Sequence, residues 1–164
     1  MREYSEAMGA LLDQVMVSEE VEEYVKKNFP ELYDTTFVEV DGMVLWEGSL
    51  NTHWGRLEKL PSWKKRRNYE TEVEYRIYNI LELNEYIEEA LSFSQSLNIA
   101  FCIYNRWKTI VKESFPHYNF YFQIHYEEKE DLFVIHFHRI RLNQPLGSRD
   151  MYKDKNGPVL VDII

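Results

Sequence analysis

Hydrophobic and polar residues alternate through two runs between residues 118 and 142, and a charged break at 127–131 separates the runs. Because successive side chains of a strand point to opposite faces, each run places three apolar side chains on one face. A hairpin buries both sets together if the two residue numbers of each cross-strand pair add up to an odd number. A loop of about four or about six residues satisfies this condition. The six residues are Phe120, Phe122, Ile124, Phe133, Ile135 and Phe137.

The opposite face of this hairpin is polar and rich in histidine. A His-x-His pair with a third histidine nearby could supply three ligands to zinc. The alternative is a solvated or partly covered sheet face, where His and Tyr fit because each has an apolar body and a polar tip. No acidic general base at a telling spacing accompanies the histidines, so we expect neither a metal site nor a cofactor. The face consists of Tyr121, Gln123, His125, Val134, His136 and His138.

Apolar residues at helical spacing predict four helices. Ser18 is the expected N-cap of the second, and Asn84 that of the third. Pro30 ends the second helix and Pro116 the fourth. The four helices are predicted over residues 2–16, 18–29, 84–97 and 99–115.

Two further segments have the residue types of strands. Asp41-Gly42, flanked by strand-type residues at 36–40 and 43–47, is a strong signal for a hairpin with a two-residue turn. Gly42 tolerates the positive φ that such a turn requires. Residues 158–164 are expected to add a last strand.

Residues 69–77 also alternate, which predicts a strand with an acidic ladder facing solvent. Like charges two residues apart repel mildly, so the ladder favours basic neighbours, and Arg139 or Arg141 could provide them. Side chains at this spacing diverge, so they do not converge on one metal ion. The ladder consists of Glu70, Glu72 and Glu74, which we take as candidate binding residues.

No regular element is predicted for residues 48–68, which contain Trp54, Trp63 and the basic run Lys64–Arg67. Two tryptophans argue against a flexible linker. One interpretation is an aromatic and basic contact loop over 53–67 that stacks on bases or holds an acidic partner. The other is a surface loop that its tryptophans attach to the core, with its charges balanced by nearby glutamates.

This order of helices and hairpins predicts an α+β fold. We expect residues 1–164 to form a single domain, with a mostly antiparallel sheet of five or six strands and helices packed on one face. A length of 164 residues and an apolar content of 45% are sufficient for a real core.

The composition favours a cytoplasmic protein. Cys102 is the only cysteine, so the chain forms no internal disulfide, and its apolar neighbours predict a buried structural thiol. No apolar stretch approaches the ~18 residues of a membrane span, and the N-terminal residues lack the apolar run of a signal peptide.

The net charge of −9 is unevenly distributed. Residues 1–50 hold three basic and twelve acidic side chains, which gives −9. Residues 51–67 hold six basic and one acidic, which gives +5, and residues 68–100 hold one basic and seven acidic, which gives −6. An acidic surface argues against general nucleic-acid affinity and suits a basic partner.

No phosphate loop, dinucleotide fingerprint, nucleophile elbow or metalloprotease helix is present. The leading hypothesis is therefore a protein-binding module rather than an enzyme. It would be a stoichiometric inhibitor, such as an immunity protein, that neutralises a basic enzyme. One alternative is a small enzyme that uses His125, His136 and His138. The other is nucleic-acid contact through the basic tryptophan loop, 53–67.

Overall fold

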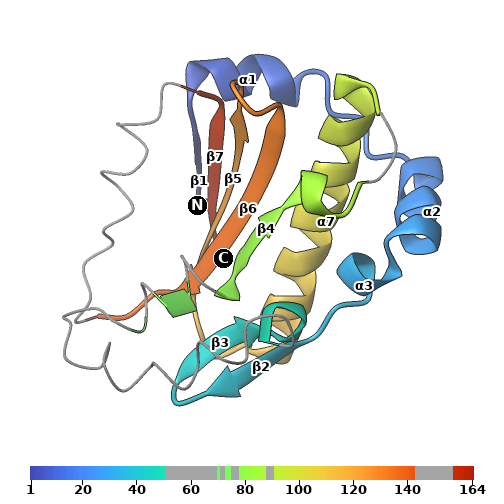
Figure 1. Cartoon of the computed structure of the whole chain (residues 1–164). Coiled ribbons are helices and arrows are strands. Elements are labelled where there is room, and N and C mark those ends of the chain that lie inside the picture. Colours follow the sequence, from blue (N-terminus) through green and yellow to red (C-terminus); the bar gives the residue numbers. More distant parts are fainter. Residues whose placement is uncertain (51–69, 71–72, 75–77, 88–90, 143–156) are drawn as a thin grey trace.

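The protein folds as α+β, with a five-stranded antiparallel sheet, a separate two-stranded sheet and helices (Figure 1). The computed structural model describes residues 1–50, 70, 73–74, 78–87, 91–142 and 157–164. The predicted fold class is confirmed. No helix in this described part of the chain is long and apolar enough to cross a membrane.

The larger sheet has the strand order β1-β7-β5-β6-β4. Its centre is the hairpin predicted from the alternation, with Phe122 opposite Phe137 and a loop at 128–131. Asp131 closes that loop with a φ of 51°. All six predicted apolar residues are buried in one cluster, which confirms the register. The strands are β1 (Arg2–Tyr4), β4 (Ile80–Glu82), β5 (Phe120–Glu127), β6 (Leu132–Arg139) and β7 (Val159–Ile163).

One long helix, α7 (Phe93–Ser114), packs on the apolar face of this sheet (Figure 1). It begins with a capping box, in which the side chains of Ser92 and Gln95 each bond to the other residue's backbone N–H. Trp107 is its main core residue, with its ring centroid 4.9 Å from that of Trp46. The Trp107 indole N–H donates to the Leu32 carbonyl at 2.8 Å, so its one polar atom is satisfied.

The smaller sheet pairs β2 (Phe37–Val40) with β3 (Met43–Trp46). Asp41 and Gly42 have φ values of 51° and 77°, so the predicted two-residue turn is confirmed. Asp41 is not a glycine, but aspartate is among the residues that tolerate this conformation.

The N-terminal part also contains three short helices, α1 (Glu6–Leu12), α2 (Glu19–Asn28) and α3 (Pro30–Tyr33). Residues 47–50 are helical as well, so the expectation of no regular element over 48–68 is wrong at 48–50. Ser18 caps α2 as predicted, because its side chain accepts from the backbone N–H of Val21. The helix predicted over 2–16 is wrong at its start, because Arg2–Tyr4 pairs with β7. Pairing with a distant strand overrides the local helical pattern here.

The helix predicted from Asn84 is also wrong. Ile80–Glu82 forms β4 at the edge of the sheet, Leu83–Glu85 forms the short 3-10 helix η2, and Asn84 lies inside that turn. Among the residues that the structure describes, the next helix begins at Phe93, where Ser92 and Gln95 provide a capping box. The expected last strand over 158–164 is confirmed as β7.

Candidate functional site

A chain of hydrogen bonds runs along the polar face of β5. Tyr121 donates its hydroxyl proton to the Gln123 Oε1 atom at 3.2 Å, and the Gln123 amide lies 3.1 Å from His125 Nδ1. His125 Nε2 lies 3.0 Å from Glu127 Oε1. We call Tyr121, Gln123, His125 and Glu127 the β5 relay. It arises because residues at i, i+2 and i+4 of a strand share one face.

The relay fixes the tautomer of His125. An amide NH2 only donates and an ionised carboxylate only accepts. The Gln123 amide nitrogen therefore donates to Nδ1 of neutral His125, and Nε2 carries the proton that is donated to Glu127.

The relay connects the interior to the surface. Tyr121, Gln123 and His125 are buried, whereas the Glu127 side chain is 41% exposed. The interpretation as a solvated face is therefore wrong, and His136 and His138 are buried as well. Buried polar groups need hydrogen-bond partners, and alternate positions on one strand supply them.

Two ring stacks cross from β5 to β6. His125 stacks on His136 with centroids 5.1 Å apart, and Tyr121 stacks on His138 at 5.0 Å. Burial lowers the pKa of His138 to about 4, and its Nδ1 lies 3.1 Å from the Arg139 carbonyl. Neutral His138 therefore donates from Nδ1 to this carbonyl.

The stacked rings are a poor donor set for a metal ion. Both nitrogens of His125 lie at hydrogen-bond distance from Gln123 and Glu127, and its ring is parallel to that of His136 within 7°. Within the described residues, no group of three or more His, Cys, Asp or Glu side chains is arranged to hold a metal.

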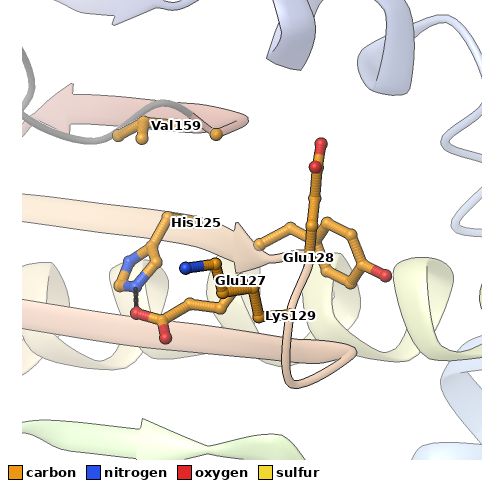
Figure 2. Close-up of a pocket in the computed structure, with 7 residues that line it drawn as sticks. His125, Glu127, Glu128, Lys129 and Val159 are labelled. Carbon is orange, nitrogen blue, oxygen red and sulfur yellow. Dashed lines mark hydrogen bonds and ion pairs between the residues drawn. The ribbon is translucent and has the colours of Figure 1, made fainter.

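The relay ends in a pocket of about 240 Å³ at the point where β5 runs into the hairpin loop and β7 begins (Figure 2). Figure 2 shows the His125–Glu127 contact in this pocket. Gly157 is required at its edge, because a Cβ there would lie 2.9 Å from the Tyr126 carbonyl oxygen. The pocket is lined by His125, Tyr126, Glu127, Glu128, Lys129, Gly157 and Val159.

Carboxylates from four elements gather beside the pocket. Partial burial raises the pKa of Glu82, and the charges of three other glutamates raise it further. In the described part of the chain, no ion pair joins Glu82, Glu85 or Glu130 to a lysine or arginine. We call this group the carboxylate cluster; it consists of Glu82 on β4, Glu85 on η2, Glu127 on β5 and Glu130 in the hairpin loop.

The predicted acidic ladder is not at this surface. Residues 70, 73, 74 and 78 are helical, so the predicted strand over 69–77 is wrong where the structure describes it. Glu74 is fully buried, and both of its oxygens accept from the Arg141 guanidinium, at 2.7 and 2.8 Å. The predicted basic neighbour is confirmed for Arg141, but as a buried pair. Glu70 is half-buried, and Glu72, Trp54, Trp63 and the rest of loop 53–67 lie outside the described residues.

Burial raises the pKa of Glu74, against the opposing effect of Arg141 and the backbone N–H groups of Val44 and Arg139. The four donors around its two oxygens hold the ionised form. Glu74 thereby joins β3 to the end of β6, which is a structural role.

A second buried carboxylate, Asp162 on β7, was not singled out by the sequence analysis. Arg2 on β1 approaches it at 2.8 and 3.0 Å, and Lys108 on α7 approaches it at 2.5 Å. The two cations lower the pKa of Asp162, although burial opposes them. A single acid inside the apolar run 158–164 was the available signal. Through these contacts, Asp162 joins β7 to β1 and to α7.

The comparison with protein families gives one match, and it covers residues 4–163. The chain belongs to the uncharacterized protein PM0498 family. No curated protein and no solved structure matches the chain. The matched region includes both the β5 relay and the carboxylate cluster.

All four residues of the carboxylate cluster were missed by the sequence-based predictions, and Glu127 is the one with a local signal. It lies two residues after His125 on the same strand, which is the spacing of a side-chain contact on one face. It was assigned to the charged break between the strands, and β5 extends one residue further than that assignment.

Proposed function

We propose that this protein binds a basic protein and that the carboxylate cluster is the centre of the contact. The observation that supports this is the crowding of Glu82, Glu85, Glu127 and Glu130. Partial burial raises the pKa of Glu82, and the charges of the other three raise it further. Like charges held together cost free energy, and a cationic partner surface would relieve that cost.

The acidic helix α2 differs from the carboxylate cluster, because its carboxylates have a basic partner in the same helix. There Lys26 forms ion pairs with Glu22 at 3.2 Å and with Glu23 at 2.8 Å, so the charges are partly balanced within the chain. Glu82, Glu85 and Glu130 have no such ion pair with a lysine or arginine among the described residues, so their charges are better suited to attract a partner. Long-range attraction acts mainly on the association rate.

A stoichiometric inhibitor of a basic enzyme, such as an immunity protein, is the kind of binding protein we propose, acting in the cytoplasm. Burial raises the pKa of the Cys102 thiol to about 11, which suits an inert structural thiol in that setting. The pocket beside the cluster would receive a lysine or arginine side chain of the partner against Glu127 and Glu128.

The test begins with purification from the native host and identification of a stoichiometric partner by mass spectrometry. Association rates are then measured at ionic strengths from about 0.05 to 0.5 M, across which screening changes several-fold. The cluster variant replaces Glu82, Glu85 and Glu130 with Gln. The matched control removes the same charge elsewhere on the surface, by replacing the exposed Glu3, Asp13 and Glu113 with neutral amides.

We expect the cluster variant to associate at least about tenfold more slowly at low salt, and the control variant to change the rate by less than about twofold. An acidic partner, or equal effects of the two variants, would contradict the proposal.

The β5 relay favours a second candidate, an enzyme that moves a proton at His125. A histidine oriented by hydrogen bonds on both ring nitrogens and placed in a pocket has the arrangement of a general acid or base. The test is incubation with a metabolite extract of the host, followed by untargeted mass spectrometry. A compound that the wild type consumes and His125→Gln does not would support this candidate; identical extracts would leave the binding protein as the better account.

A further inference from the structure

The helices α2 and α3 pack on one side of α7 (Figure 1). On that side, a groove lies between α2 and the described residues just before α7. It is made of two hollows of about 250 and 370 Å³. Tyr24 and Leu91 line both hollows, so the two adjoin at these side chains. We call it the Tyr24 groove.

The first hollow is mainly apolar, the second is mainly polar, and each has an acidic edge. Val21, Tyr24, Leu91 and Ile99 line the first hollow, and Tyr24 is 39% exposed. Glu20 borders the first hollow and Glu31 the second, and no lysine or arginine lines either hollow among the described residues.

Three polar side chains of the first hollow already have a structural role. Ser92 and Gln95 form the capping box of α7, and Asn98 accepts from the Met16 N–H at 2.7 Å. An occupant of this hollow would therefore gain most from the apolar surface.

The negative charge of the groove continues toward the carboxylate cluster. Burial raises the pKa of Tyr86, which lines the second hollow, and the charges of Glu85 and Glu31 raise it further. Glu85 belongs to the cluster, so the two surfaces adjoin at Tyr86.

We propose that the Tyr24 groove binds an amphipathic, basic helix of the partner protein. This rests on the proposed function, which requires a basic partner. No strand lines the groove among the described residues, so an extended segment would find no strand edge there to pair with. A helix satisfies its own backbone, places apolar side chains at i, i+3 and i+7 on the apolar floor, and places Lys or Arg against Glu20 and Glu31.

The probe is an 18-residue peptide of Leu and Lys with Leu at helical spacing, long enough to form about five turns. A scrambled peptide of the same composition is the control, because an acidic protein attracts any cationic peptide. Binding to the full chain is measured by calorimetry and by amide chemical shifts. Tyr24→Lys is the groove variant. The control is Tyr4→Lys, which makes the same substitution on the edge strand β1, at a residue that is 55% exposed.

We expect the amphipathic peptide to bind at least about tenfold more tightly than the scrambled one, with shifts centred on Tyr24, Leu91 and Ile99. Tyr24→Lys should remove this tenfold advantage, and Tyr4→Lys should keep it. Equal affinity of the two peptides, or shifts centred elsewhere, would overturn the groove as a helix site.

With the natural partner, the groove and the cluster act on different rates. Tyr24→Lys should raise the dissociation rate at least about tenfold, while the cluster variant slows association. If Tyr24→Lys leaves dissociation unchanged and the cluster variant still slows association, the groove is refuted and the proposed function stands. If the peptide binds the groove but the cluster variant leaves partner association unchanged, the proposed function fails and the groove stands.

Discussion

The two faces of the β5–β6 hairpin are both buried, but different forces hold them. One face packs six apolar side chains under α7, with Phe122 stacked on Phe137 at 4.7 Å. The other face buries hydroxyl, amide and imidazole groups that satisfy one another through the β5 relay. Burial by itself therefore does not tell how a face responds to change. The apolar face should respond to lost volume, and the polar face to lost partners and to pH.

The largest effect should come from the apolar face. Phe122→Ala should lower the free energy of unfolding by about 3–5 kcal/mol, because the side chain is fully buried and its removal leaves a cavity. Urea unfolding measures the loss, and Met16→Ala, at a residue 73% exposed, is the control with an expected change below about 0.5 kcal/mol. An unchanged midpoint for Phe122→Ala would mean that the two apolar sets do not share a core.

On the polar face, Gln123→Met should lower the free energy of unfolding by about 1–3 kcal/mol, although it nearly conserves volume. The change removes one hydrogen-bond partner from Tyr121 and one from His125, both of which are buried. Glu127→Gln, at the exposed end of the relay, should cost less than about 1 kcal/mol. If both substitutions lower the free energy of unfolding by the same amount, the buried part of the relay does not stabilise the fold more than its exposed end.

The two faces should also differ in their response to acid. His138 stays neutral in the folded state down to a pKa of about 4, whereas in the unfolded chain it takes up a proton below about 6.5. Its contribution is therefore full above about pH 6.5 and is lost as the pH falls from there toward 4. Between pH 7 and pH 5 the wild type should lose about 2 kcal/mol more than His138→Gln. Parallel losses in urea titrations of the two proteins would contradict the buried neutral histidine.

Zinc should have the smallest effect, namely none. A metal would have to displace Gln123 or Glu127 from His125, and the stacked rings do not converge on one point. Untagged protein should therefore hold no stoichiometric zinc by elemental analysis, and added zinc should leave the melting temperature unchanged. One equivalent of bound zinc that His136→Ala abolishes would show that the polar face is a metal site and would contradict this prediction.

Local signals were sufficient for much of the fold. The alternation around Phe122 identified the central hairpin and its register, Asp41-Gly42 identified the second hairpin, and Ser18 identified the start of α2. Each signal lies within a few residues of the structure that it predicts. The helix propensity of residues 2–16 was overridden at Arg2–Tyr4 by pairing with β7, which is more than 150 residues away.

The candidate site was only partly predictable for the same reason. Alternation placed Tyr121, His125, His136 and His138 on one face, but it does not say whether that face is covered. The glutamates at 70, 72 and 74 resemble a solvated ladder, yet Glu74 is buried because Arg141 approaches it from β6's end. The carboxylate cluster joins β4, η2 and the hairpin, and no short sequence window contains all three.

The outer edge of β3 has a consequence for the order of folding. The N–H and C=O groups of β3 that do not pair with β2 are hydrogen-bonded to the side chains of Glu74 and Asn79. These side chains lie 30 to 35 residues further along the chain. A hairpin with a two-residue turn forms within about 1–10 µs, whereas these side chains arrive only after a long loop closes. During that interval β3 is an open edge that another chain can pair with. Refolding yield should therefore fall as protein concentration rises, and dilution should restore it.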